Sequence, residues 1–272
     1  MEYEIKPAGR FSLNLSELWE YRELIFFFTW RDIKVKYKQT FFGAAWAVFQ
    51  PLLLMVVFTV FFARNFTIES GNIPYPVFVF SGLLLWNVFA NGLSNAGNSM
   101  VTNANIIKKI YFPRLIIPIS SILSAMVDFL ISIFVYFCVL FFYGLQSTIP
   151  SILLMLPLSL LITLCTTLGA GSFLAALNVK YRDFRYVIPF LIQVLMFMTP
   201  IIYPVSTPDM EWVRTLLLLN PMTGAIDLIR SAVMQVPVNQ MAVVMASVSS
   251  LLWLIIGISY FRRTEYYFAD LA

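Results

Sequence analysis

The chain has 272 residues, of which 60% are hydrophobic and 12% are charged, and its formal net charge is +4. Soluble domains are about 25% charged, so this composition excludes an ordinary soluble protein and predicts an all-α integral membrane protein with little room for a separate soluble domain. The chain contains no histidine, which excludes catalysis and proton shuttling based on imidazole.

Residues 1–40 are predicted to form a cytoplasmic segment that contains an amphipathic helix at the membrane interface. Asn14, followed three positions later by Glu17, resembles a capping box, a pattern that starts many helices. Apolar side chains then recur at helical spacing at Leu18, Tyr21, Ile25 and Phe28. Residues 33–38 alternate apolar side chains with lysine and would also fit a strand. We favour a helix because a lone strand at a membrane boundary leaves its backbone groups unpaired.

Residues 41–261 are predicted to form one transmembrane domain with six membrane-spanning helices. The first span directly follows a basic patch, since Lys38 is the last charged residue before an uncharged run from Gln39 to Ala63. Six apolar segments have suitable lengths: 42–63, 74–96, 115–142, 150–177, 187–204 and 241–261. Cys138 and Cys165 fall inside them, so we expect apolar packing and neither a disulfide nor a metal site.

Lysine and arginine are distributed unequally between the two sides of these spans. Fifteen of the 18 fall in the compartments that hold the two ends of the chain, and clustered positive charge beside spans favours the cytoplasm. The N-terminal segment and a C-terminal tail, residues 262–272, are therefore predicted to be cytoplasmic. This distribution accounts for the basic net charge without a nucleic-acid partner.

The fifth span differs from the others because prolines interrupt its far end. Pro200 and Pro204 each remove a backbone donor, and proline bends or ends a helix. The following segment, Glu211 to Met234, is moderately apolar and has turn signals at Asn220-Pro221 and near Gly224. We predict a re-entrant helical hairpin on the outer side. The alternative, an additional full span, would place the C-terminal tail outside.

The connection between the second and third spans, residues 97–114, is predicted to be cytoplasmic and to contain a short helix. Asn103 or Asn105 would cap its start, and Pro113 would end it. Its apolar and basic side chains are Ile106, Ile107, Lys108, Lys109 and Ile110. Such a helix would suit contact with a cytoplasmic motor, and the alternative is a membrane-surface turn with snorkelling lysines. Residues 178–185 allow the same two interpretations.

Asp128 is the one acidic residue well inside a predicted span. A charge at this depth is costly, so the side chain should face protein or water and not lipid. Two roles remain open: a contact in a channel or dimer, and a structural hydrogen bond to Ser124 or Ser132, each four residues away. Coupling to proton movement is a third alternative.

Several short motifs occur along the chain in a characteristic order. They are Arg31-Asp-Ile-Lys-Val-Lys-Tyr-Lys-Gln-Thr40 with Gly43, Trp46 and Gln50-Pro51, then Phe112-Pro113-Arg114 with Pro118, then Tyr181-Arg-Asp-Phe184, Thr199-Pro-Ile-Ile-Tyr-Pro204 and Leu219-Asn-Pro221. Together they resemble the permease subunit of ABC-2 polysaccharide exporters, above all the O-antigen and teichoic-acid export permeases, with capsule exporters close by. The resemblance covers essentially the whole chain.

The resemblance implies a channel-forming subunit of an ATP-driven exporter that moves undecaprenyl-linked polysaccharide across the bacterial inner membrane. It implies a homodimer with two copies of a separate ATPase, which would bind ATP and Mg, whereas this chain would be no enzyme and would hold no cofactor. The sequence has no Gly-Lys dipeptide and hence no G-x-x-x-x-G-K-[ST] loop for ATP phosphates. The residues that the resemblance assigns to ATPase coupling are Asn105, Ile106, Ile107, Lys108 and Lys109, and those that it assigns to the outer gate are Pro200, Pro204, Asn220 and Pro221.

Aromatic residues make up 17% of the chain, and their flat rings offer amphipathic, non-ionic surfaces on which sugars can stack. Weak sites repeated along a channel would let a polymer slide. Candidate channel aromatics are Tyr37, Phe41, Phe42, Trp46 and Phe49 near the first span, Trp86 and Phe89 in the second, and Phe197 and Tyr203 in the fifth. The alternative for each is lipid-facing packing or a place in an interfacial aromatic belt.

Two other functions remain open: an ABC-2 permease for drugs or lipids, and a membrane enzyme that acts on polyprenyl-linked substrates. The enzyme is disfavoured because paired carboxylates are scarce, Asp209 and Glu211 being the only close pair outside the N-terminal region. The two transporter functions are separated mainly by the resemblance.

Overall fold

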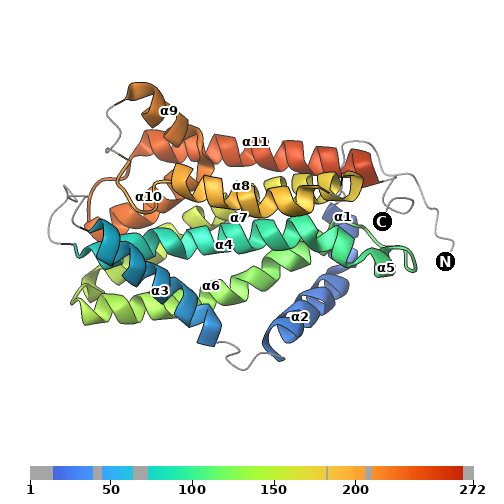
Figure 1. Ribbon diagram of the computed structural model, residues 1–272, viewed down its shortest axis with the longest axis horizontal. Coiled ribbons are helices and arrows are strands. Elements are labelled where there is room, and N and C mark those ends of the chain that lie inside the picture. Colours follow the sequence, from blue (N-terminus) through green and yellow to red (C-terminus); the bar gives the residue numbers. More distant parts are fainter. Residues whose placement is uncertain (1–14, 39–44, 64–72, 182, 206–209, 266–272) are drawn as a thin grey trace.

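The computed structural model describes residues 15–38, 45–63, 73–181, 183–205 and 210–265 (Figure 1). Within these ranges every regular element is a helix, which confirms the predicted all-α fold. The elements are α1 (Leu15–Glu20), α2 (Arg22–Lys38), α3 (Ala45–Phe62), α4 (Tyr75–Thr102), α5 (Ala104–Ile107), α6 (Ile116–Phe142), η1 (Gln146–Thr148), α7 (Ile149–Lys180), α8 (Phe184–Met198), α9 (Glu211–Leu219), α10 (Pro221–Met234) and α11 (Gln240–Thr264).

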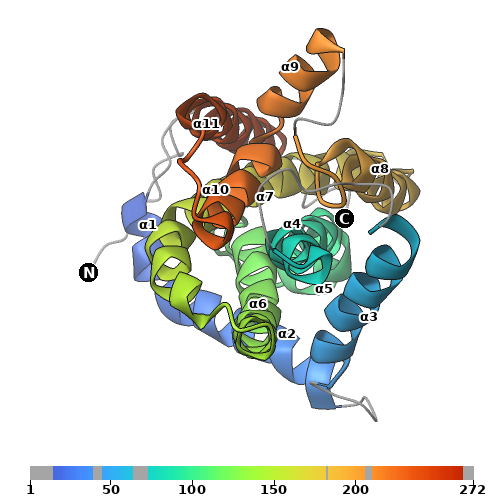
Figure 2. The same cartoon turned by 90° about the vertical axis from the view of Figure 1, so that its left-hand side faces the viewer.

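Five of these helices, α3, α4, α6, α7 and α11, are long and apolar enough to cross a membrane. Lipid favours helices because a helix satisfies its backbone hydrogen bonds internally. The five lie side by side, and α4 is central, in contact with α3, α6, α7, α8 and α10 (Figures 1 and 2). The predicted spans 115–142, 150–177 and 241–261 correspond to α6, α7 and α11 and are confirmed, and the predicted span 42–63 is confirmed from Ala45 onward by α3, since residues 42–44 lie outside the described residues.

The second span is longer than predicted, because α4 continues to Thr102 and not to residue 96. Its last turns contain polar residues that bond to the backbone of their own helix. The Asn98 side-chain amide donates to the Ser94 carbonyl at 2.8 Å, and the Thr102 hydroxyl donates to the Asn98 carbonyl at 3.0 Å. The predicted connection 97–114 is therefore wrong at its start, and the chain leaves the helix only at Asn103.

The helix ends gather in two groups along the long axis of the molecule. α1, α5 and the C-terminal end of α11 lie at one end, on the right in Figure 1, and α9 lies at the other end. The first and last helices of the described residues therefore share one end of the bundle. Which end faces the cytoplasm stays a prediction.

The predicted fifth span, 187–204, is shorter in the structure. α8 ends at Met198, and its 15 residues extend roughly 22 Å, less than a hydrocarbon core of about 30 Å. Beyond it, α9 and α10 meet at a bend of 90°, so the predicted break at Asn220-Pro221 is confirmed, while re-entry from the outer side stays a prediction. The turn expected near Gly224 is wrong, because Gly224 lies inside α10 and packs directly against the Ala242 carbonyl and the Ala246 side chain of α11.

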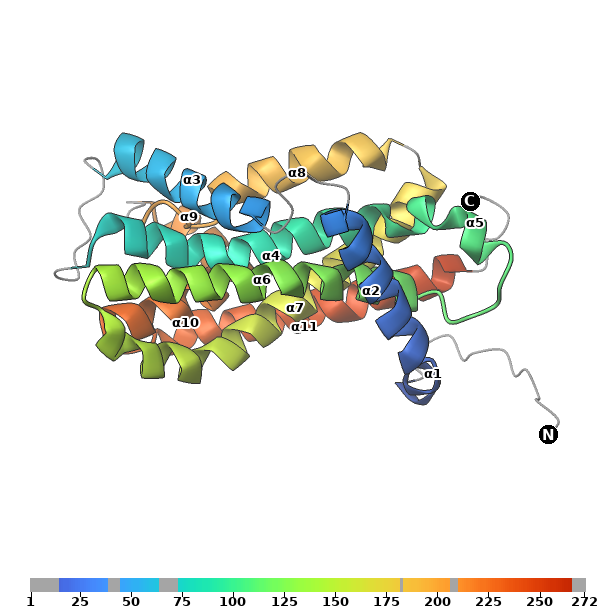
Figure 3. The ribbon, with the colours of Figure 1, turned by 90° about the horizontal axis from the view of Figure 1, so that it is seen from below.

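The N-terminal helix α2 crosses α6 obliquely (Figure 3). It remains helical to Lys38, so the strand alternative for residues 33–38 is wrong. Leu18 of α1 and Phe28 of α2 are buried, and the Phe28 ring lies 5.7 Å from the ring of Phe112. The predicted apolar face therefore packs against the bundle, while the proposed cap at Asn14 lies outside the described residues.

Candidate functional site

Asp128 contacts the C-terminal end of α2. Its side chain, 12% exposed on α6, pairs with the ammonium group of Lys36 and accepts a hydrogen bond from the Tyr37 hydroxyl. A carboxylate with two such partners has the polar environment that a buried charge needs. Asp128 therefore ties the C-terminal end of α2 to the middle of α6, a role that the sequence did not indicate, whereas the position of α2 at the membrane interface stays a prediction.

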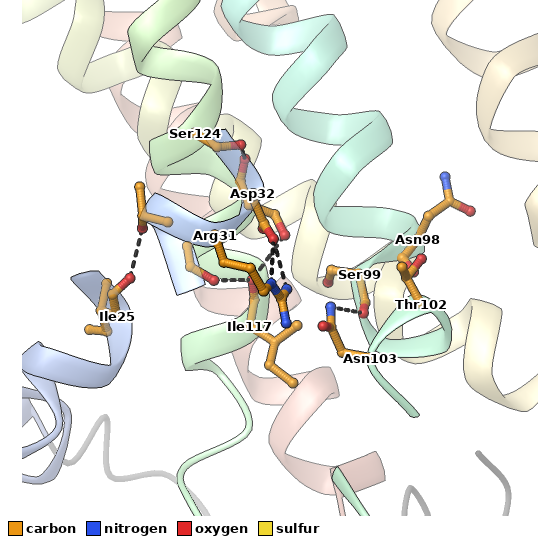
Figure 4. A network of polar contacts seen from close by, with 12 residues as sticks. Ile25, Arg31, Asp32, Asn98, Ser99, Thr102, Asn103, Ile117 and Ser124 are labelled. Carbon is orange, nitrogen blue, oxygen red and sulfur yellow. Dashed lines mark hydrogen bonds and ion pairs between the residues drawn. The ribbon is translucent and has the colours of Figure 1, made fainter. Parts of the chain in front are cut away.

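The alternative of a hydrogen bond from Asp128 to Ser124 or Ser132 is not found among the described residues, since Asp128 bonds to Lys36 and Tyr37. Ser124 donates instead to the Ser121 carbonyl of its own helix at 2.8 Å. Figure 4 shows other polar groups of α2, α4 and α6 that are paired locally. The Arg31 guanidinium donates to the Asp32 carboxylate at 2.7 and 3.0 Å, and the Asn103 amide donates to the Ser99 carbonyl at 2.8 Å. The partners found for Asp128 are the two side chains of α2, Lys36 and Tyr37.

Asp128→Asn is expected to lower the free energy of unfolding by about 2 kcal/mol, because it removes a hydrogen-bonded charge pair whose lysine is only partly exposed. Thermal unfolding of the detergent-purified protein measures the effect. Lys36→Met and the double variant complete a cycle, in which we expect a coupling energy above about 0.5 kcal/mol. Additive losses would contradict a direct interaction between the two side chains.

The predicted coupling segment is a single short turn of helix. α5 has four residues, so the predicted helix is shorter than expected, and Asn103 does not cap it because its amide donates back into α4. Asn105 and Ile106 lie inside α5, and Ile107 is buried. Lys108 and Lys109 are exposed. They line a cavity of about 190 Å³ together with Ile107, Ile110, Tyr111, Phe112 and Arg114.

Arg114 fixes this segment to the end of α11. Its backbone N–H donates to the Glu265 carboxylate at 3.3 Å, and its guanidinium donates to the Glu265 carbonyl. Burial raises the pKa of the Glu265 carboxyl, and the contacts with Arg114 act in the opposite direction. The Phe112-Pro113-Arg114 motif thus joins the loop after α5 to the C-terminal end of the bundle.

Asn220 joins the predicted outer gate to the break after α8. Its side-chain oxygen accepts from the Met222 N–H at 3.0 Å and so caps α10, in which Pro221 is the first residue. Its amide donates to the Thr199 hydroxyl at 2.9 Å. Pro200 is buried beside Thr199, and Pro204 is partly buried at the far end of the same non-helical segment. Three of the four predicted gate residues therefore gather at one junction.

Arg230 holds the same junction and was missed by sequence reasoning. This α10 residue is 4% exposed, and its guanidinium donates to the carbonyls of both Pro200 and Ile201. The guanidinium lies 3.6 Å from the centre of the Phe78 ring, and Tyr75 donates to the Ile202 carbonyl at 2.8 Å. An arginine inside an apolar run, following a proline-broken helix, was the available signal.

Some of the candidate channel aromatics are exposed at the surface of the chain, and others are buried in its core. Trp46 and Phe49 of α3 are more than half exposed with ring centres 5.8 Å apart, and Phe197 of α8 is equally open. Trp86 and Phe89 are buried in the core of α4, and Tyr37 contacts Asp128. The Tyr203 hydroxyl donates to the Phe197 carbonyl at 3.1 Å. Phe41 and Phe42 lie outside the described residues.

Comparison with known proteins gives a consistent result. The family model for ABC-2 type transporters matches residues 23–234. An O-antigen export system permease protein RfbA of Myxococcus xanthus is 31% identical over 255 residues, which cover 92% of this chain and 96% of the relative. A protein of the same name from Klebsiella pneumoniae is 29% identical, with 92% and 95% covered. The polysialic acid transport protein KpsM of Escherichia coli is 26% identical, with 86% and 91% covered.

Proposed function

We propose that this chain, which belongs to the ABC-2 type transporter family, is the channel-forming subunit of an ATP-driven exporter of undecaprenyl-linked polysaccharide such as O-antigen. The observation that carries the proposal is the match, over nearly the full length of both chains, to relatives named as O-antigen export permeases. A polysialic acid transport protein is also similar, so the relatives share the transport of a sugar polymer.

The energy source is proposed to be a separate ATPase, bound to ATP and Mg, at the end of the bundle that holds α1 and α5. The absence of a phosphate-binding Gly-Lys motif from the sequence supports this division of labour. At that end Lys108 and Lys109 are exposed, beside a buried anchor at Ile107. These residues would transmit movement of the ATPase to α4 and α6, which the segment connects.

The functional unit is proposed to be a homodimer in the inner membrane, with the N and C termini cytoplasmic. α3 and α8 are largely uncovered in the single chain. The buried residues are Pro51 and Phe58 in α3 and Ile188 in α8. These two helices flank α4 on its side away from α6, α7 and α10 (Figure 2). A second copy placed there would cover both helices and enclose a path bordered by Trp46, Phe49 and Phe197.

Depletion of this protein is expected to trap lipid-linked polysaccharide on the cytoplasmic face of the membrane. An impermeant lectin, applied to intact and to opened cells, measures the distribution of the polymer between the two faces. Wild-type protein should restore display. A chain with both Lys108→Glu and Lys109→Glu should not, because charge reversal at a contact surface opposes association.

The controls for this experiment are total polymer and the amount of the variant in the membrane, both of which should be normal. Unchanged display after depletion, with intact synthesis, would refute polysaccharide export and favour a permease for drugs or lipids. Full rescue by the double lysine variant would refute the proposed ATPase contact alone.

A further inference from the structure

α4 has one uncovered face, and that face is polar. The helix is the most buried of the five spans, yet from Asn87 onward a stripe at helical spacing remains partly or fully exposed. Apart from Ala90 and Val101, its members carry amides or hydroxyls: Asn87, Asn91, Ser94, Asn95, Asn98 and Thr102. Residues three and four positions apart share a helix face, so these side chains form a continuous track.

The outward faces of the neighbouring spans are apolar, unlike the exposed face of α4. α6, α7 and α11 present large apolar side chains, among them Leu130, Phe134, Leu154, Leu161, Leu251 and Ile255. The partly exposed serines of α11, Ser247 and Ser249, donate to carbonyls of their own helix. Such surfaces suit lipid. A side-chain amide without a partner does not, because hydrocarbon offers nothing to replace its hydrogen bonds with water.

Three side-chain amides of the track form no hydrogen bond to a carbonyl of their own helix or to another described residue. Asn98 donates to Ser94 and accepts from the Asn178 amide at 3.2 Å. For Asn87, Asn91 and Asn95, no hydrogen bond of the side chain is found among the residues that the structure describes. We call these three residues the amide ladder. Its groups must bond to water or to a polar molecule outside the chain.

The ladder lies between two helices that carry exposed aromatic rings. α8 packs along one side of α4, and α3 packs along the other side (Figure 2). The contact with α8 is close, because a Cβ atom added at Gly97 of α4 would lie only 2.7 Å from the Ile188 side chain of α8. Trp46 and Phe49 of α3 and Phe190 and Phe197 of α8 are each more than half exposed. Asn87 and Asn91 are only partly exposed whereas Asn95 is exposed, so the first two amides of the ladder are recessed relative to these rings.

We propose that the amide ladder lines a water-filled lane and hydrogen-bonds the hydroxyl groups of a carbohydrate chain in transit. This inference rests on the proposed function and names the groups of the channel that bind the polymer. A side-chain amide offers both donors and an acceptor, which match a hydroxyl group in either role. Its neutrality makes each contact weak, and one amide per helical turn, at a rise of about 6 Å, repeats the site along the path.

A sugar chain is a better occupant than a second copy of the protein. The exposed rings of α3 and α8 would meet an approaching copy first and hold its helices away from the recessed amides of Asn87 and Asn91. A flexible, hydroxyl-rich chain can reach a recessed track. The rings on either side also supply stacking surfaces that suit the flat faces of sugars.

Cysteine labelling tests whether the lane is wet and occupied. In a full-length chain with Cys138→Ser and Cys165→Ser, we would introduce Asn91→Cys or Asn95→Cys and add a membrane-impermeant maleimide. Leu130→Cys, at an exposed apolar position of α6, is the matched lipid-facing control. We expect at least about tenfold faster labelling in the ladder than at Leu130, and slower ladder labelling in cells that make the polymer than in cells that lack its synthesis.

Three outcomes of the labelling would overturn the inference. Ladder labelling as slow as that of Leu130→Cys would show that the lane is not wet. Efficient disulfide formation between two Asn91→Cys copies would assign the face to a second copy. Ladder labelling that is fast but unaffected by the polymer would show a wet path without carbohydrate contact.

Export by amide variants tests the chemistry of the contact. Asn91→Leu with Asn95→Leu preserves the approximate size but removes the amides, and we expect export to fall about tenfold, as the loss of hydrogen bonds at repeated sites predicts. Asn91→Gln with Asn95→Gln keeps the amides and should export within about twofold of wild type. Equal export by the leucine pair and the glutamine pair would overturn the inference, and it would do so even if depletion of the protein blocks display of the polymer.

The failure of the proposed function gives a different result. Display of the polymer that is unchanged after depletion would refute polysaccharide export, while fast labelling of the ladder cysteines would still show a water-filled lane.

Discussion

Arg230→Met is expected to lower the free energy of unfolding by about 3 kcal/mol or more and to loosen the outer helical pair. The substitution keeps much of the side-chain volume but removes the two donors that bond the carbonyls of Pro200 and Ile201. Both carbonyls belong to buried residues, so water cannot easily replace the guanidinium. Each buried acceptor left without a donor costs roughly 1–3 kcal/mol, and more when a charged partner is lost.

Thermal unfolding of the purified protein measures this loss, with Arg214→Met as the matched control. Arg214 is an exposed arginine on α9, in the same bent pair, and its replacement should change stability by no more than about 0.5 kcal/mol. Arg230→Lys should be intermediate, because an ammonium keeps the charge but not the planar fork that reaches two carbonyls. Equal stability of the two methionine variants would show that the carbonyls find other partners.

The position of Arg230 also has a consequence for movement. α8 ends at Met198, two residues before Pro200, so the carbonyls of its last residues and of the segment beyond lack the backbone donors of a following helical turn. Arg230 supplies donors from α10, and Asn220 adds a bond from the bend to Thr199. Any opening of the bent pair must therefore either carry the end of α8 with it or break these bonds.

The spans were predictable because they depend on local properties of the sequence. A long uncharged apolar run can only be a helix in lipid, and an Asn-Pro pair marks a bend in the same way wherever it occurs. The boundary of α4 was not predictable by the same means. Asn98 and Thr102 read as loop residues, yet in the structure they bond to carbonyls of their own helix and prolong it.

The partners of buried polar groups were less predictable than the helices. Asp128 and Lys36 are 92 positions apart, and no local pattern connects them. Arg230 lies in the segment predicted to be re-entrant, but the sequence does not show which carbonyls of the bundle its guanidinium meets. Trp86 looked like a channel residue by type, but its place on the inner side of α4 buries it. The residue type indicated which interactions a side chain could form, but only the packing of the helices showed which residue is its partner.

Gly257→Val is expected to prevent normal folding, with a cost of at least about 3 kcal/mol. Gly257 of α11 and Gly169 of α7 face each other where the two helices cross. A side-chain carbon at Gly257 would collide with the carbonyl of Gly169, and one at Gly169 would collide with the carbonyl of Trp253. Because the obstacles are backbone atoms, no rotamer change relieves the collision, and the helices must separate.

The separation would be costly because α7 also packs against α4 and α10, and small residues are what allow membrane helices to approach this closely. The amount of folded protein in the membrane and its thermal unfolding measure the effect. Ile256→Val is the matched control, since Ile256 is the adjacent residue and is mostly exposed. Gly257→Ala should fall between the two, because its single methyl group already meets the Gly169 carbonyl but is smaller than valine. Wild-type stability of Gly257→Val would mean that α7 and α11 cross at a greater distance than the structure gives.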